Sequence, residues 1–528
     1  MDDNEGEPTM RKPLIVAIGG AVCLVLALIL ALSGVIPLST SGQAVASAPT
    51  RAQHQLNDAT LPMADAPAAQ YSGEMAVDGR TLAVQDLTVT AAGDVSGKIA
   101  VNQQPAEVLE LDGTTYVKAG AGFWEAWNSD GPDNIRRDST GAAGNWAMVP
   151  PGFFGVDLGT LLRPSSFALT SQDQDDRIQP DAPTTPVAAG DQTPDRRGTP
   201  TGDPADIRIG PMQDDGQTIV AGQNPVRLNP DGTIYGIAGP VRTAPADRPT
   251  TSKLKVTLLS NDGVTEFYAT VQGLKDPLSK VAAPEVNVPK PVGNLDNCTN
   301  TYCLLVYNFS NSMPGADRGT VTIVQTSSLT VNGAPAGTCT RTTTMKMNGT
   351  GMSQCVFTFA DPRTRTINYH ADSNFTISAT AEKDVTVIVQ SAERGRDVAT
   401  KQPGHWFPVG YKLDPNARRF NQQITGNPSG FAYLVGDVPF DGRETDGTLL
   451  MTAAPGYDSH VSAGGVFDPA WPGTAQLLDQ AKKAAAAGEG QPVRWVFAEQ
   501  RSAGAASKLL ADNGISGIQV VTVPLAGA

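Results

Sequence analysis

Four cysteines lie close together in the second half of the chain, and their number and spacing indicate one kind of chemistry. They are Cys298, Cys303, Cys339 and Cys355, whereas the fifth cysteine, Cys23, lies far from them. An even, clustered set of cysteines in an exported protein is typical of two disulfide bonds. Free thiols are less expected in an oxidising compartment, and zinc is disfavoured because the spacing has no paired Cys-x-x-Cys units. Of the three pairings that four cysteines allow, we expect the local one, Cys298–Cys303 with Cys339–Cys355.

The stretch from about residue 400 to the end alternates helix-like and strand-like segments. A helix-like segment at 417–423 is followed by a hairpin pattern at 431–457, an Ala-rich helix pattern at 474–488 and an apolar strand pattern at 493–499. A further helix pattern at 503–514 leads into a final strand pattern that ends at Pro524. This order predicts an α/β domain.

Three segments of this stretch read ARRFNQQITGNPSGFAYLVGDVPFDG, LLDQAKKAAAAGEGQPVRWVFAE and LLADNGISGIQVVTVP. From about Asp414 to Pro524 they resemble the fifth restriction-endonuclease-fold toxin family, nuclease domains at the C-termini of secreted polymorphic toxins. The resemblance implies an Asp on one strand, an Asp or Glu on the next and a Lys two residues later. Such a set holds one or two Mg²⁺ ions, and the metal lowers the pKa of the attacking water.

The chain departs from that pattern at the residues that matter for catalysis. Asp441 keeps the first acid, but Met451 replaces the second acid and Ala453 replaces the lysine. Gln422 stands where the family commonly has a Glu in the first helix. One carboxylate cannot assemble a site for a hard cation, so we expect no metal, no cofactor and no catalysis. Asp441 is then expected to serve as a turn residue in an Asp-Gly corner.

An alternative interpretation keeps the nuclease through relocated groups. The acids that could replace the missing one are Glu444, Asp446, Asp458 and Glu499. A relocated lysine is harder to find, because Lys482 and Lys483 lie on the expected Ala-rich helix, whose exposed face would carry them anyway. Since metal-assisted hydrolysis needs all its groups placed together, we expect a lost active site.

A long uncharged segment near the N-terminus predicts a membrane partner. Leu14 to Leu38 contains no charged side chain, and a helix of about 20 residues spans the ~30 Å hydrocarbon core. Arg11 and Lys12 precede it and the next basic residue is Arg51, so the positive-inside rule leaves the N-terminus in the cytoplasm and exports the rest. The alternative is a cleaved signal peptide, with a small-residue site at Ala44–Ala46.

The exported region between these two segments is rich in strand patterns. Alternating apolar and polar residues with Asp-Gly and Asn-Gly turns fill 71–275 and 294–395, and the second stretch predicts an immunoglobulin-like sandwich carrying the disulfides. The predicted fold class is therefore a membrane-anchored, multidomain chain. Its parts are a cytoplasmic tail (1–13), a transmembrane helix (14–38), a flexible stalk (39–70), a β-rich domain (71–275) with a disordered insertion (172–206), a linker (276–293), the sandwich (294–395) and the α/β domain (400–528).

The β-rich domain shows a second resemblance. AEVLELDGTTYVKAGAGFWEAW and MVPPGFFGVDLGTLLRPSSFALT are similar to actinobacterial envelope lipoproteins of the LprG/LppX family. That resemblance implies a curved antiparallel sheet wrapped over helices around a lipid-binding cavity. The alternative, which the pattern slightly favours, is a β scaffold with a filled core.

The net charge of the chain narrows the classes of partner that we expect it to bind. The net charge of −14 disfavours a nucleic-acid surface of the usual basic kind. The leading hypothesis is a single-pass cell-envelope protein that binds an envelope protein or lipid and contains a catalytically inactive nuclease fold. The alternatives are a membrane-tethered toxin with Mg²⁺-dependent nuclease activity and an envelope lipid carrier.

Overall fold

Tight two-residue turns join neighbouring strands into hairpins. Strands β1 (Ala68–Val77) and β2 (Arg80–Thr90) are connected by Asp78-Gly79, whose φ angles of 51° and 76° suit the turn that matches strand twist. Asn332-Gly333 makes the same kind of turn further along the chain, with φ angles of 52° and 82°. The computed structural model that shows these turns describes residues 48–127, 134–171, 207–214, 216–221, 224–240, 250–360, 367–409 and 413–527.

The hairpins add up to one large sheet. Within the described residues it has 16 strands, nearly all antiparallel to their neighbours. Fifteen follow one another in the order β17 (Ala334–Lys346), β16 (Arg318–Val331), β19 (Tyr369–Glu382), β13 (Lys280–Ala282), β7 (Trp146–Val149), β5 (Thr114–Ala119), β4 (Gln104–Leu111), β3 (Val95–Val101), β2, β1, β12 (Thr250–Leu259), β11 (Ile234–Pro240), β10 (Asn224–Leu228), β9 (Gln217–Ala221) and β8 (Ile207–Ile209), and β6 (Ile135–Arg137) pairs with β19.

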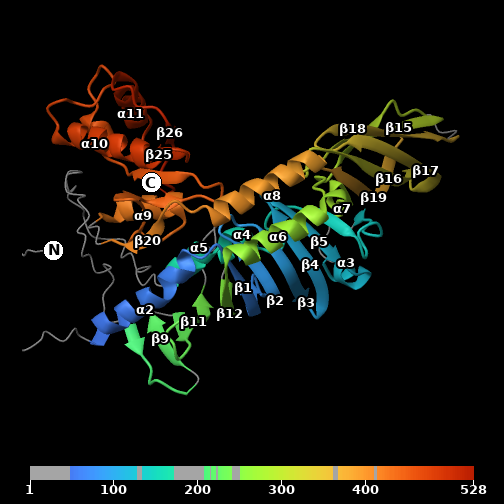
Figure 1. The fold of residues 1–528 in the computed structure, drawn as a ribbon. Helices are drawn as coiled ribbons and strands as arrows, with labels where there is room; N and C mark the ends of the chain where they lie inside the picture. Colours follow the sequence, from blue (N-terminus) through green and yellow to red (C-terminus); the bar gives the residue numbers. More distant parts are fainter. Residues whose placement is uncertain are drawn as a thin grey trace, which may run out of the picture. The chain divides into compact units, whose positions relative to one another are not determined.

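Helices cover both faces of this sheet. Adjacent residues of β4 point to opposite sides, and Val108 packs in one apolar core while Leu109 packs in the other. The first core includes side chains of α2 (Ala48–Ala64), α3 (Ala121–Trp127), α4 (Leu158–Leu162) and α5 (Pro164–Thr170). The second includes side chains of α6 (Asn261–Gly273), α7 (Lys275–Ser279) and α8 (Val385–Thr400), and α6 and α8 run side by side in Figure 1.

A smaller sheet packs against the far end of the large one. It consists of β14 (Val292–Asp296), β15 (Tyr302–Ser310) and β18 (Thr350–Thr358), and a separate apolar cluster fills the space between the two sheets. Cys298 pairs with Cys303, and Cys339 of β17 pairs with Cys355 of β18. The local disulfide pairing expected from the sequence is therefore confirmed, and the second bond ties one sheet to the other.

Beyond α8 the chain forms two further sheets with three long helices. The first sheet contains β20 (His405–Pro408), β21 (Phe431–Val435) and β22 (Val438–Phe440). The second contains β23 (Gly442–Arg443), β24 (Leu449–Ala453), β25 (Val493–Phe497) and β26 (Ile518–Thr522), of which the last three are parallel. The helices are α9 (Pro415–Thr425), α10 (Pro472–Ala487) and α11 (Gln500–Asp512).

The predicted fold class, a membrane-anchored string of separate domains, is wrong. Strand β13 pairs with β7 on one side and β19 on the other, so the expected sandwich is continuous with the sheet of the β-rich region, and the described residues from Ala52 onward belong to one compact unit. Strand patterns identify hairpins, but they do not tell which sheet a short connecting strand joins.

The predicted transmembrane helix, Leu14 to Leu38, lies outside the described residues, as do the cytoplasmic tail and the insertion at 172–206. Of the helices that the structure describes, none is both long and apolar enough to cross a membrane.

The predicted flexible stalk also differs from the structure over its described part. Helix α2 occupies residues 48–64, and Leu56 and Met63 are fully buried against the sheet. The Asp65 carboxylate, directly after this helix, accepts a hydrogen bond of 2.7 Å from the backbone N–H of Trp406. The Ala-, Thr- and Pro-rich composition suggested a linker, but a few well-spaced apolar residues are enough to bury one face of a helix.

Replacing Leu56 by Ala should test whether α2 belongs to the core. We expect a loss of about 2–5 kcal/mol in the free energy of unfolding, because the substitution leaves a cavity in a packed interface. The exposed His54 on the same helix provides the control, and His54→Ala should change the free energy by no more than about 0.5 kcal/mol. Chemical denaturation measures both, and equal small effects would mean that α2 contributes nothing to the fold.

Candidate functional site

Asp441 lies between β22 and β23, where the chain turns from one small sheet into the next. Its Oδ2 accepts hydrogen bonds from the backbone N–H of Thr452, at 2.6 Å, and from the Thr452 hydroxyl, at 3.0 Å. Asp441 is half-buried, and loss of water around its carboxyl raises its pKa to about 6 despite these bonds. The carboxylate is thus used to hold strand β24.

The two positions predicted to have lost the acid and the lysine do not face Asp441. Met451 and Ala453 are buried in the apolar core with Trp495. Thr452, which does reach Asp441, points to the other face of β24, because side chains alternate along a strand. The resemblance to the nuclease family implies that residues 441, 451 and 453 converge, and the structure does not bring them together. An acid restored at position 451 would be buried in the core.

Gln422 lies on α9, where its backbone carbonyl accepts from the backbone N–H of Gly426 at the end of the helix. Its neighbour Asn421 is the residue of α9 that reaches this place. Asn421 is 4% exposed and donates to the Thr452 hydroxyl across 3.3 Å, while its own Oδ1 has no partner. The result is a small network of Asp441, Thr452 and Asn421 with a single carboxyl group.

The acids considered as replacements for the missing one are engaged elsewhere. Glu444 forms an ion pair with Arg494. Glu499 accepts from the backbone N–H of Asp458 at 2.8 Å, and Asp458 accepts from that of Ser502 at 2.7 Å. These two carboxylates therefore organise the start of helix α11. Lys482 and Lys483 are exposed on α10, as the helix pattern predicts.

Across the described residues, no group of three or more His, Cys, Asp or Glu side chains could hold a metal ion.

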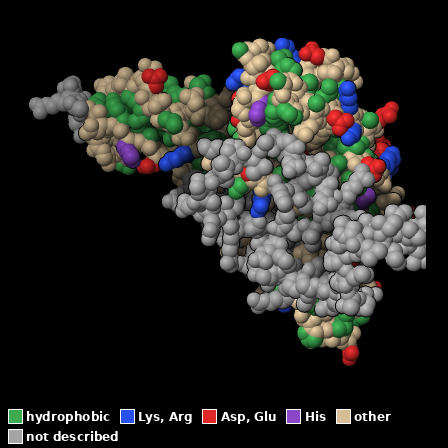
Figure 2. Space-filling view, turned by 90° about the vertical axis from the view of Figure 1, so that its left-hand side faces the viewer, with side chains coloured by type: hydrophobic (Ala, Val, Ile, Leu, Met, Phe, Trp, Pro, Cys, Tyr) green, Lys and Arg blue, Asp and Glu red, His purple; other side chains and the backbone are tan. Residues whose placement is uncertain are grey.

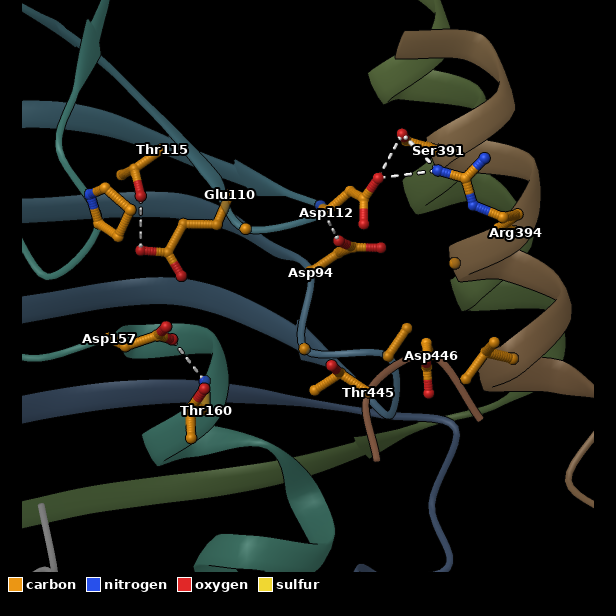
Figure 3. Close-up of a pocket in the computed structure, with 16 residues that line it drawn as sticks. Asp94, Glu110, Asp112, Thr115, Asp157, Thr160, Ser391, Arg394, Thr445 and Asp446 are labelled. Atoms are coloured by element: carbon orange, nitrogen blue, oxygen red, sulfur yellow. Dashed lines mark hydrogen bonds and ion pairs between the residues drawn. The ribbon is translucent and has the colours of Figure 1, made fainter. Parts of the chain in front are cut away.

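A second concentration of acids lies where the large sheet, α4, α8 and the β23–β24 loop meet (Figure 3). It surrounds a cavity of about 170 Å³. The charged residues that line this cavity are Asp94, Glu110, Asp112, Asp157, Asp446 and Arg394. We call it the acidic pocket; its lining contains five carboxyl groups and one guanidinium group.

Two of these carboxyls are almost completely buried. Asp94 is 4% exposed, and its Oδ2 accepts from the hydroxyl of Tyr268 on α6 at 2.6 Å. Glu110 is 6% exposed, and its Oε2 accepts from the backbone N–H of Gly159 on α4 at 2.9 Å. Each carboxyl therefore connects a loop or strand of the sheet to a different helix.

The remaining acids are nearer to water and already have partners. Asp112 accepts from Ser391 and Arg394 of α8, each at 2.8 Å. Asp157 caps the first turn of α4, and Asp446 accepts from a backbone N–H in its own loop. Figure 3 shows Ser391 and Arg394 pointing from α8 toward Asp112.

Burial dominates the acid–base behaviour of the two enclosed groups. It raises the pKa of Asp94 to about 7 and that of Glu110 to about 8, and the neighbouring carboxylates of Asp112 and Asp157 raise them further. Hydrogen bonds to Tyr268 and Gly159 act in the opposite direction. Near neutral pH these groups can exchange protons, which is the chemistry that the acidic pocket supports.

Sequence reasoning missed the acidic pocket. Glu110 occupies the AEVLELDG strand, where an acid between two leucines looks like the solvent-facing half of an alternating pattern. Leu109, Glu110 and Leu111 are all buried, because helices cover both faces of the sheet there. The one available signal in the sequence was that apolar residues occupy both faces of this strand end, so neither face is marked as exposed.

Comparisons with known proteins give no family for this chain. No family model matches it, and no curated protein matches it. Among solved structures, it is similar to a calcium-binding mutant of a β-glucuronidase from Bacteroides uniformis, with 10% identity, a TM-score of 0.13, and coverage of 60% of this chain and 47% of that one. An α-xylosidase from Xanthomonas citri matches with 7% identity, a TM-score of 0.09, and coverage of 78% and 49%. The chain spans about half the length of each, and likenesses this weak carry no argument about fold or function.

Substitutions at Asp441 should separate a structural from a catalytic role. Asp441→Ala leaves the Thr452 N–H without its acceptor, and we expect a loss of about 1–3 kcal/mol in the free energy of unfolding. Asp441→Asn keeps an acceptor and offers a donor to the unpartnered Asn421 Oδ1, so it should be at least as stable as wild type at pH 7.5.

The pH dependence follows from the raised pKa of Asp441. An acid that is harder to ionise in the folded protein costs stability as pH rises from about 4 through 6, and Asp441→Asn should remove about 1–3 kcal/mol of that decline. Urea denaturation between pH 4 and 8 measures both variants. Equal destabilisation by Asn and Ala at every pH would contradict this role.

Proposed function

We propose that this protein acts outside the cytoplasm by binding an envelope protein or lipid, and that its C-terminal part does not hydrolyse nucleic acid. The observation that carries the proposal is the state of Asp441. Its Oδ2 is committed to Thr452, and among the described residues no group of three or more His, Cys, Asp or Glu side chains could hold a metal ion. A divalent ion that assists hydrolysis needs several oxygen ligands at one place.

The disulfide bonds support an oxidising location. Two bonds among the four clustered cysteines are typical of exported proteins and rare in the cytoplasm.

The charge distribution supports a partner other than nucleic acid. The chain carries a net charge of −14, and on the described part of the face drawn in Figure 2 acidic and basic side chains are interspersed. A nucleic-acid site of the usual kind gathers Lys and Arg into a patch or stripe.

A cleavage assay on the full chain tests the non-hydrolytic part of this proposal. Purified protein is incubated with single- and double-stranded DNA and RNA in Mg²⁺ or Mn²⁺, beside Asp441→Ala. We expect both proteins to leave the substrates intact at the level of buffer alone. Metal-dependent cleavage by wild type that Asp441→Ala abolishes would establish the tethered-nuclease alternative instead.

A second candidate function, binding of a lipid or other amphipathic molecule, is favoured by one cleft. Helix α2 and the strands β9 to β12 border a space of about 440 Å³, within the ~300–1,000 Å³ typical of small-molecule sites. Its wall combines exposed apolar side chains, Met212 at 58% and Leu258 at 37%, with polar groups such as Gln55 and Asp58. The space beneath the sheet itself is filled by apolar side chains, so a ligand would occupy the edge of α2.

Native mass spectrometry of the full chain tests this second function. We expect co-purified amphipathic molecules with wild type, and at least a fivefold lower occupancy in Asp58→Trp, whose indole would fill the cleft. His54→Trp adds the same bulk to an exposed position of α2 outside the cleft and should retain the ligand. Protein free of any ligand in wild type would remove this candidate.

A further inference from the structure

The two buried carboxyls of the acidic pocket are each overlaid by a glycine from a helix. A Cβ added at Gly395 of α8 would lie 2.2 Å from Asp94 Oδ2 and 2.5 Å from the Tyr268 hydroxyl oxygen. A Cβ added at Gly159 of α4 would lie 2.0 Å from the carbonyl oxygen of Gly93 and 3.1 Å from Glu110 Oε2. Real Cβ atoms do not come within 3.0 Å of such atoms, so α8 docks at Gly395 directly over Asp94, and α4 docks at Gly159 against the Gly93 carbonyl beside Glu110.

This close docking removes water from both acids. A carboxylate in such a place loses its hydration and is costly, whereas the protonated form needs only hydrogen-bonding partners. Asp94 has such partners, since the Tyr268 hydroxyl lies between Asp94 at 2.6 Å and the Thr90 hydroxyl at 3.2 Å. The same hydroxyl can donate to an ionised Asp94, or accept a hydrogen bond from protonated Asp94 while donating to Thr90.

The charged and titratable groups around the two acids come from several elements, and Asp446 of the β23–β24 loop lines the same cavity. Asp94 faces Asp112 of the β4–β5 turn, Arg394 of α8 and Tyr268 of α6. Glu110 faces Asp157 before α4 and, more distantly, Asp94 itself. The cation Arg394 is already paired with Asp112 at 2.8 Å, so it is a weak counterion for a second carboxylate.

We propose that Asp94 and Glu110 form a proton-controlled clasp, which holds α8 and α4 against the sheet when both are protonated and loosens when they ionise. Ionisation places two negative charges under two docked glycines, beside Asp112 and Asp157. Release of the helices readmits water to the carboxylates. Because α8 leads directly into the last 128 residues, the clasp controls how firmly that part is held.

The direction of the pH effect follows from the raised pKa values. Both carboxyls hold protons in the docked state that they would lose in water above about pH 4.5. The stabilisation of the docked state is therefore complete below about pH 4 and is lost as pH rises through about 7 for Asp94 and about 8 for Glu110. The clasp is firm in an acidic surrounding and loose in an alkaline one.

Hydrogen exchange of the full chain, with amide rates corrected for intrinsic pH dependence, tests the clasp. In wild type we expect the protection factors of α8 amides to fall at least about tenfold between pH 6 and pH 8.5, since between the pKa of a free carboxyl and that of the docked carboxyl each pH unit shifts the docking equilibrium by up to about tenfold. In the double variant Asp94→Asn/Glu110→Gln we expect no such fall in the protection factors of α8 amides. Glu393→Gln removes an exposed acid from α8 itself and should behave as wild type.

Unchanged protection of α8 in wild type across this range would overturn the proposal, as would an equal fall in the double variant. If the double variant does not fold, the wild-type titration and the variant Gly395→Ala still test the proposal. The Cβ added at position 395 overlaps Asp94, so in this variant α8 should be poorly protected at pH 6 as well. Full pH-dependent protection of α8 in Gly395→Ala would contradict the docking.

Discussion

The free-energy cost of taking a carboxyl group out of water governs both candidate sites of this molecule. At Asp441 the cost is offset in part by Thr452, which donates through its backbone and its hydroxyl, so the pKa rises only to about 6 and the acid becomes part of the strand framework. At Asp94 and Glu110 it is offset only partly, so their pKa values rise to about 7 and 8. The same physical constraint thus leaves one acid in a structural role that titrates near pH 6, and gives two others pKa values near neutral pH.

Continuity of the large sheet brings Asp94 and Glu110 together with the helices that cover them. Asp94 follows β2 and Glu110 lies on β4, while of the helices that cover them α4 ends at Leu162 and α8 begins only at Val385. Strand β13 carries the sheet from β7 to β19, and α8 follows β19. That connection returns α8 to the face where α6 lies, and the two glycines then allow a contact too close for any other residue.

Local features were predictable and long-range ones were not. The turn at Asp78-Gly79 and the disulfide between Cys339 and Cys355 follow from dipeptide conformation and cysteine spacing, and the structure has both. The packing of α2, the joining of β13 to two neighbours and the burial of Glu110 depend on surfaces contributed by distant segments. Alternation of side chains along a strand predicts that Met451 and Ala453 share one face of β24. It does not reveal that this face packs in the core, or that Asp441 contacts the opposite face through Thr452.

A structure determined from crystals soaked in Mn²⁺, with the metal located by its anomalous scattering, tests the central claim most directly. The account predicts no bound ion beside Asp441 and a carboxylate still hydrogen-bonded to Thr452, because no second acid is available there to complete a site. An ion coordinated by Asp441 together with another carboxylate, with a lysine beside it, would contradict the account and restore the hydrolytic interpretation.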